Sequence, residues 1–120
     1  MAISKSLTNR LPQEVASTIL HRSSCAVKVG ACLSDKEGVW EVGWNSAGPS
    51  GFGQHAEVSC IVRAMRQGRK DRLASSTLWV AAIRLSSGNV VIARPCIECQ
   101  EWTRMVGRVV YRDPALWKEL

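Results

Sequence analysis

Two short segments contain the residue types that hold metal ions and move protons. His55 and Glu57 lie two residues apart in QHAEVSC, and Cys96 and Cys99 lie three residues apart in RPCIEC. On a helix, cysteines at this spacing share one face, so both sulfurs can bind one ion. A position in the first helical turn also favours the thiolate, the form that binds metal. The cysteine pair alone is also compatible with a redox pair or with half of a four-ligand structural zinc site.

The number of ligands distinguishes a structural zinc site from a catalytic one. A structural zinc normally has four protein ligands, whereas a catalytic zinc has three and keeps one position open for water. His55, Cys96 and Cys99 supply three. Cys60 lies more than one helical turn beyond His55, and we interpret it as a small core residue. Glu57 is close enough to His55 to reach a water at the open position, so we assign it the role of general acid and base.

The elements that must position these residues follow from hydrophobic periodicity and turn residues. The segment SAGPSGFGQ is rich in glycine and is predicted to be a loop that delivers His55 to the start of a helix. Pro95 is well suited to a second helix N-terminus. The predicted elements are a helix over 12–23, a β-hairpin over 26–45, a helix over 55–67, strands over 76–85 and 90–94, a helix over 96–106, a strand over 108–113 and a short terminal helix that carries Leu116 and Trp117 after Asp113-Pro114. This order indicates an α/β sandwich.

The size and composition of the chain are those of a globular protein. Its 120 residues, 46% hydrophobic and 22% charged, have room for one core of moderate size, so we expect a single domain over 1–120. No apolar run is long enough to cross a bilayer, and the first residues lack the pattern of a secretory signal. Five cysteines, an odd number, favour free thiols and metal binding over disulfides. We therefore expect a cytoplasmic protein without membrane association.

The charge of the chain favours partners that carry phosphate. Sixteen basic and ten acidic side chains give a formal net charge of +6. Part of this excess is local, because five basic residues fall within 63–72: Arg63, Arg66, Arg69, Lys70 and Arg72. We interpret this run as the solvated face of a helix, with a contact surface for nucleotides or nucleic acid as the alternative.

The two segments together resemble a known signature. HAE followed by PCIEC is similar to the H-x-E … P-C-x-x-C pattern of the zinc-dependent cytidine and deoxycytidylate deaminase superfamily. The resemblance extends over 26–112 and implies a three-layer α/β/α sandwich with a mixed sheet of about five strands and metal-binding helix N-termini. It implies one zinc ion per chain, bound by His55, Cys96 and Cys99, and proton transfer by Glu57.

The resemblance also implies contacts with the substrate. Asn45 would contact the sugar, and the backbone of Ala56 would help to hold the edge of the base. The implied reaction is the hydrolysis of a cyclic amidine C–N bond, in which water attacks C4 of cytosine and ammonia leaves. Relatives are usually oligomers, so we expect a homo-oligomer. A phosphate on the substrate would need a nearby cation, for which Lys28, Arg84 and Arg94 are unranked candidates.

The substrate class is the least determined part of this interpretation. The preferred substrate is a cytosine nucleoside or nucleotide of the cytidine or dCMP type. A predicted hairpin lengthens the chain before Pro95, and such flanking segments vary with the substrate in this superfamily. The alternatives are a deaminase that acts on cytosine or adenine in single-stranded DNA or RNA, and a non-catalytic, zinc-stabilised module that binds nucleic acid.

Overall fold

The computed structural model describes residues 9–47 and 54–120. The predicted loop over 46–54 therefore lies largely outside the described residues. At its two ends, Ser46 and Gln54 form an isolated antiparallel bridge. The elements are α2 (Pro12–Ile19), the 3-10 helix η1 (Leu20–Arg22), β1 (Val27–Asp35), β2 (Gly38–Trp44), α3 (Ala56–Arg66), α4 (Lys70–Leu73), β3 (Thr77–Arg84), β4 (Val90–Val91), α5 (Ile97–Thr103), β5 (Arg108–Arg112) and β6 (Trp117–Glu119).

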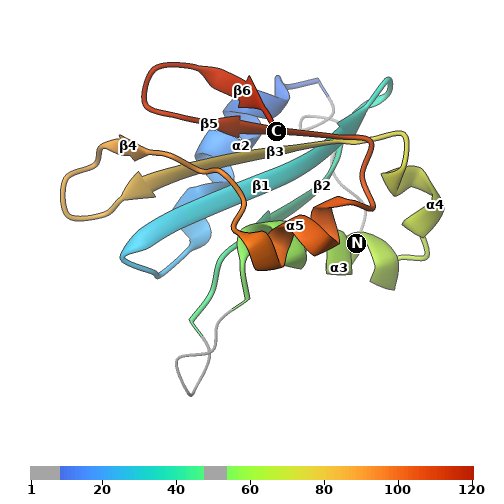
Figure 1. Cartoon of the computed structure of the whole chain (residues 1–120), viewed down its shortest axis with the longest axis horizontal. Helices are drawn as coiled ribbons and strands as arrows, with labels where there is room; N and C mark the ends of the chain where they lie inside the picture. Colours follow the sequence, from blue (N-terminus) through green and yellow to red (C-terminus); the bar gives the residue numbers. More distant parts are fainter. Residues whose placement is uncertain (1–8, 48–53) are drawn as a thin grey trace.

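The strands form one mixed sheet (Figure 1). Its order is β2-β1-β3-β5-β6, and the short β4 pairs with the outer end of β3. The pairing of β3 with β5 is parallel, and the other pairings are antiparallel. The expected mixed sheet is thus confirmed, and the described parts of the chain contribute six strands to it in place of about five.

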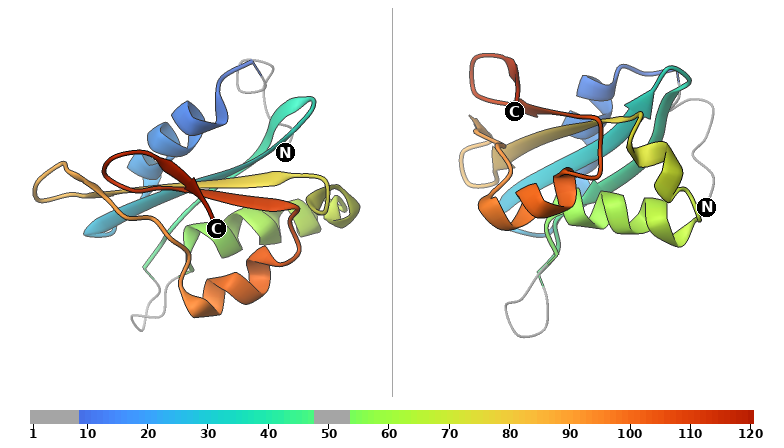
Figure 2. Two further views of the ribbon diagram at one scale, coloured as in Figure 1. Left: turned by 45° about the horizontal axis from the view of Figure 1, so that its top comes forward. Right: turned by 45° about the vertical axis from the view of Figure 1, so that its right-hand side comes forward.

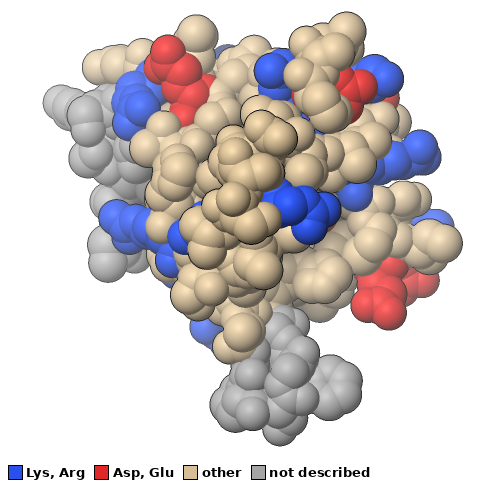
Figure 3. Space-filling model, turned by 90° about the vertical axis from the view of Figure 1, so that its left-hand side faces the viewer, with Lys and Arg blue, Asp and Glu red and all other residues tan. Residues whose placement is uncertain are grey.

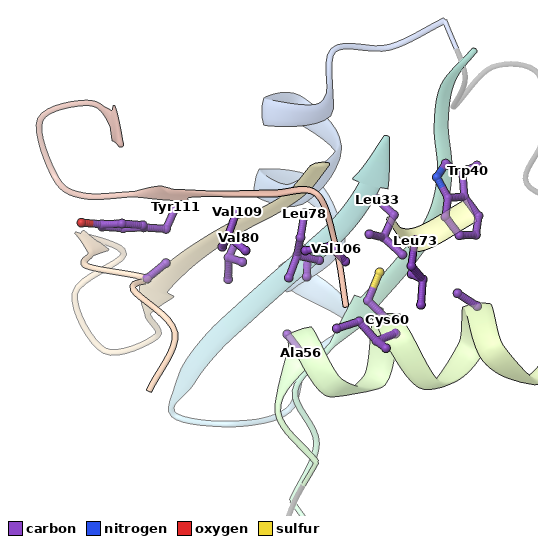
Figure 4. Close-up of a cluster of buried hydrophobic side chains, with 14 of the residues drawn as sticks. Leu33, Trp40, Ala56, Cys60, Leu73, Leu78, Val80, Val106, Val109 and Tyr111 are labelled. Atoms are coloured by element: carbon purple, nitrogen blue, oxygen red, sulfur yellow. The ribbon is translucent and has the colours of Figure 1, made fainter. Parts of the chain in front are cut away.

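Helices cover both faces of the sheet, which gives the expected three layers (Figure 2). The reason is that β3 has an unbroken apolar run over 78–83, whose side chains point alternately to the two faces of the sheet. Leu78 and Val80 pack into the core beneath α3, which Figure 4 shows, whereas Ala81 faces the smaller core beneath α2. Because the central strands are apolar on both faces, they bury both sides against helices.

A glycine brings α3 directly onto the sheet. A Cβ at Gly43 would lie 2.6 Å from the backbone nitrogen of Cys60 and 2.7 Å from the backbone oxygen of Ala56. Both distances are well below ordinary van der Waals contact, so any other residue would push α3 away from β2. The absence of a side chain at Gly43 therefore sets the height of α3, and with it the height of His55, above the sheet.

The end of the chain differs from the prediction. In place of a short terminal helix, the chain turns back and adds β6 beside β5. The Asp113 carboxylate accepts hydrogen bonds from the backbone of Ala115 and Leu116, which closes the turn. Trp117 then packs edge-on against Trp79, with ring centroids 5.9 Å apart. The helix prediction was wrong because pairing with β5 and this aromatic contact decide the conformation of a segment with little helical pattern.

Smaller differences concern element lengths. The strand predicted over 90–94 forms ladder pairs only at Val90–Val91, and α5 ends at Thr103, before the predicted end at 106. The short α4 was not predicted. In the described parts of the chain, no helix is long and apolar enough to span a membrane.

Candidate active site

Two helix N-termini meet on one side of the sheet. His55 is the N-cap residue of α3, and Glu57 is the second residue of that helix. Cys96 is the N-cap residue of α5, and Cys99 lies in its first turn. Because α3 and α5 lie side by side in all views, their N-terminal ends are neighbours (Figure 1, Figure 2). Both chemical segments therefore lie at helix starts, as predicted.

The structure brings three of the predicted residues into one cluster. The Nδ1 atom of His55 lies 2.9 Å from Sγ of Cys99 and 3.6 Å from Sγ of Cys96. The potential ligand atoms of the three residues all lie within 4.8 Å of one another. Ligand atoms on a tetrahedral zinc ion, with bonds of about 2.0–2.3 Å, are roughly 3.5 Å apart. The cluster thus matches a zinc-sized ion after the separation of His55 Nδ1 and Cys99 Sγ increases by about 0.6 Å.

The chemistry of the donor atoms also fits zinc. Two sulfurs and one imidazole nitrogen are ligands that zinc prefers, and three of them leave a fourth position open. Burial raises the pKa of the Cys99 thiol, and the nearby Glu57 charge raises it further. A bound cation would favour the thiolate and reverse this shift. The site is consistent with one zinc ion per chain.

Cys60 is separate from this cluster. Its side chain is fully buried in the core between α3 and the sheet. Burial raises the pKa of its thiol well above the ordinary value. It is therefore an inert core residue, as the sequence predicted.

Glu57 faces a cavity next to the cluster. The cavity has a volume of about 240 Å³, and its walls include the apolar side chains Val27, Val29, Ala82 and Ile92. Glu57 is only 5% exposed. Burial raises the pKa of its carboxyl group, and a hydrogen bond from its own backbone N–H and the nearby His55 offset part of this increase. A carboxyl group thus lies in a mostly apolar cavity beside the three potential ligands.

The two predicted substrate contacts, Asn45 and Ala56, also line this cavity. The Asn45 side chain is held by the backbone of β1. Its Oδ1 accepts a hydrogen bond from Val29 at 2.9 Å, and its Nδ2 donates one to the carbonyl of Val27 at 2.8 Å. One amide N–H and one lone pair of Asn45 remain for another partner. The roles of both residues as substrate contacts remain predictions.

The basic run over 63–72 makes contacts within the fold. Arg72 forms ion pairs with Asp35 and Glu37 and lies 4.6 Å from the centre of the Trp40 ring. Arg63 lies 4.3 Å from the centre of the Trp44 ring. Two of the five basic residues thus contact other parts of the fold, whereas Arg66 and Lys70 are exposed. The interpretation of the run as a solvated helix face stays a prediction.

Sequence reasoning did not rank Arg94, which lines the same cavity as Glu57. It also missed the apolar walls that β1 and β3 contribute. The sequence contained one signal for Arg94, its position directly before Pro95 and Cys96. The walls could not be found in this way, because strand residues far apart in the chain become neighbours only in the folded sheet.

Comparisons with known proteins agree with this geometry. The family model described as "cytidine and deoxycytidylate deaminase zinc-binding region" matches residues 7–112. A cytidine deaminase from Burkholderia pseudomallei has a similar structure, with a TM-score of 0.72 and 17% sequence identity over 98% of this chain and 92% of that chain. A cytidine deaminase from Mycobacterium leprae has a TM-score of 0.61 and 20% identity, covering 89% and 88%. At these identities the likenesses show a shared fold. No curated protein sequence matches the chain.

Proposed function

The chain belongs to the cytidine and deoxycytidylate deaminase zinc-binding family, and we propose that it converts a cytosine nucleoside or nucleotide to the uracil product with release of ammonia. The observation that carries this proposal is the position of Glu57. It is buried in the cavity wall beside His55 and Cys96, while the ligand cluster itself consists of His55, Cys96 and Cys99. A purely structural zinc site gives no reason to bury a carboxyl group there.

The reaction requires a nucleophile and a group that moves protons. When bound, a zinc ion activates water as a nucleophile at neutral pH. Glu57 accepts a proton from the attacking water and delivers it to N3 of the ring as the oxygen–C4 bond forms. Glu57 then transfers the second proton of that water to the amino group. The C4–N bond breaks, ammonia leaves, and a carbonyl group remains at C4.

The other cavity residues orient the base. The apolar side chains of Val29, Ala82 and Ile92 pack against the ring and exclude water. The backbone of Ala56 holds the edge of the base, and Asn45 contacts the sugar through its remaining N–H group. Because β1 already fixes the Asn45 amide, this contact costs little side-chain entropy on binding.

The test is Glu57→Gln, which keeps the size of the side chain and removes its ability to transfer protons. We expect the variant to retain its zinc, measured by elemental analysis, and to lose about 10²- to 10⁴-fold in ammonia release. Glu101→Gln is the matched control, because Glu101 is exposed on α5. Undiminished ammonia release by a zinc-loaded Glu57→Gln protein would show that the assigned mechanism is wrong.

We further propose that the protein is a cytoplasmic homo-oligomer. All five cysteines lie within the described residues and are free thiols, which supports a reducing compartment. Ile97, at the start of α5, is 83% exposed, which supports burial against another copy. Light scattering that gives the monomer mass of 13.2 kDa at all concentrations would refute the oligomer.

A further inference from the structure

Arg94 is one of the residues that line the cavity containing Glu57, and its side chain ends in a guanidinium group. Among the described residues that line this cavity, Arg94 is the one with a permanently cationic side chain, and it is exposed to solvent. Within the described parts of the chain, no carboxylate forms an ion pair with it. Figure 3 shows the left-hand side of the view in Figure 1, where separate basic and acidic side chains lie on a largely uncharged surface. Arg94 is thus free to bind an anionic group of a ligand.

The backbone around Arg94 is fixed on both sides. The N–H of Ala93 donates a hydrogen bond to the carbonyl of Arg112 at 2.8 Å. The carbonyl of Pro95 accepts one from the side chain of Gln100 at 3.0 Å. Pro95 also restricts the backbone of the residue before it to extended conformations. The starting point of the Arg94 side chain is therefore set before any ligand binds, which lowers the cost of using it.

The other two cations predicted near the site are less suitable. The Lys28 amine donates a hydrogen bond to the carbonyl of Ser23, so this group is already in use. Arg84 is exposed at the end of β3 and is not among the described residues that line the cavity. Arg94 is consequently the cation with the most direct access to a ligand whose reacting atom lies beside Glu57.

We propose that Arg94 binds the 5′-phosphate of a nucleotide substrate and so makes the enzyme select nucleotides over nucleosides. This inference rests on the proposed function, which places the cytosine ring beside Glu57 in the same cavity that Arg94 lines. Sites for drug-sized ligands have volumes of roughly 300–1,000 Å³. The cavity of about 240 Å³ suits a base and its sugar and leaves the phosphate at the rim. The planar guanidinium of arginine matches two phosphate oxygens at once.

The kinetic test compares deoxycytidine 5′-monophosphate with deoxycytidine for the zinc-loaded protein. We expect the wild type to have the higher kcat/KM for the nucleotide. Arg94→Gln should lower the ratio of the two kcat/KM values by roughly 10- to 100-fold, the size of a lost charge-assisted hydrogen-bond pair. Arg94→Lys keeps the positive charge but lacks the planar guanidinium that binds two phosphate oxygens, so it should lower the ratio less. A ratio unchanged in Arg94→Gln would overturn the inference.

Two arginine variants serve as controls for the loss of charge. Arg66→Gln removes an exposed arginine on α3, and Arg84→Gln removes the one at the end of β3. Neither should change the ratio of kcat/KM values. If this ratio falls only in Arg84→Gln, the assignment to Arg94 is overturned. If the ratio falls equally in all three variants, the effect is one of general charge, and the assignment is also overturned.

A binding measurement separates this inference from the proposed function. Calorimetry with the unreactive deoxyuridine 5′-monophosphate and deoxyuridine should show a preference for the nucleotide that Arg94→Gln reduces by roughly 10- to 100-fold. If this preference is found but ammonia is released from no cytosine compound, the proposed function fails and the phosphate contact stands. If both deoxycytidine compounds react equally well in the wild type and in Arg94→Gln, the proposed function stands and the phosphate contact fails.

A third arm distinguishes a mononucleotide from a nucleic acid as the source of the phosphate. A single-stranded oligonucleotide with one cytosine is added to the same assay. We expect deoxycytidine 5′-monophosphate to react with the higher kcat/KM. If only the oligonucleotide reacts, and Arg94→Gln lowers its kcat/KM, then the phosphate that Arg94 binds belongs to a nucleic-acid strand. This result would overturn the mononucleotide assignment.

Discussion

The contact between Gly43 and α3 leads to a prediction about how the fold holds the site. Gly43 lies on β2, and its backbone dihedral φ is not positive, so the position does not require glycine for conformational reasons. It requires glycine for space. In Gly43→Ala, the new Cβ would be 2.6 Å from the backbone nitrogen of Cys60, 2.7 Å from the Ala56 oxygen and 2.9 Å from the Cys60 Cα. All three atoms belong to the backbone of α3, which cannot rotate aside as a side chain could.

The size of the effect follows from these distances. Ordinary van der Waals contact begins at 3.4 Å, so α3 must move away from β2 by about 0.8 Å or distort. Overpacking of this kind costs roughly 1–3 kcal/mol in the free energy of unfolding. The same movement shifts His55 and Glu57 relative to Cys96 and Cys99 at the start of α5. Misplacement of reacting groups by about 1 Å can lower a rate about 100-fold.

Gly68→Ala is the matched control. Gly68 follows the same helix, has a φ of +72°, and has open space around it. An added methyl group is therefore strained locally, at a cost of about 1 kcal/mol, without pushing on any neighbour. We expect both variants to be less stable than the wild type, whereas only Gly43→Ala should bind zinc more weakly.

Three measurements on the wild type and both variants test this prediction. Urea denaturation gives the free energy of unfolding, competition with a chromogenic chelator gives the dissociation constant of zinc, and ammonia release gives kcat/KM. We expect Gly43→Ala to weaken zinc binding by at least 10-fold and to lower kcat/KM by 10- to 100-fold or so. If Gly43→Ala and Gly68→Ala have the same zinc affinity and activity, the close approach of β2 does not set the position of His55.

Two further predictions concern the metal and the stability of the fold. Cys99→Ser should reduce the zinc content from about one ion per chain to near zero by elemental analysis, whereas Cys25→Ser should not; a full zinc complement in Cys99→Ser would contradict the ligand assignment. Arg72→Met removes the ion pair with Asp35, whose pKa is held below its ordinary value of 3.8 by the hydrogen bond from Arg72. A lowered carboxyl pKa stabilises the fold above the unfolded pKa, and this contribution is lost as the pH falls through the folded pKa. The variant should therefore be about 1 kcal/mol less stable than the wild type at pH 6, and the difference should shrink below about pH 4 in urea denaturation; a difference independent of pH would count against the ion pair.

Much of the fold could be predicted from the sequence because local patterns and tertiary packing agree. A continuous apolar run over 78–83 indicated a buried strand, and apolar residues recur with helical spacing over 55–67; these segments became β3 and α3. The turn predicted over 35–38 lies between β1 and β2, as expected. Prediction failed at the C-terminus, where Leu116 and Trp117 fit a helix or a strand equally well. Pairing with β5 and the contact with Trp79 decided between them.

The sequence by itself determined the chemistry of the candidate site. The spacing of Cys96 and Cys99 indicated two sulfurs on one helix face. The resemblance of HAE and PCIEC to the deaminase signature indicated His55 as the third ligand and Glu57 as the group that moves protons. Only the tertiary structure decided that the two pairs meet, with 2.9 Å between His55 and Cys99. It also selected Arg94 as the cation at the cavity. Contacts between segments far apart in the chain depend on how helices pack on the sheet, and a local sequence pattern does not indicate that packing.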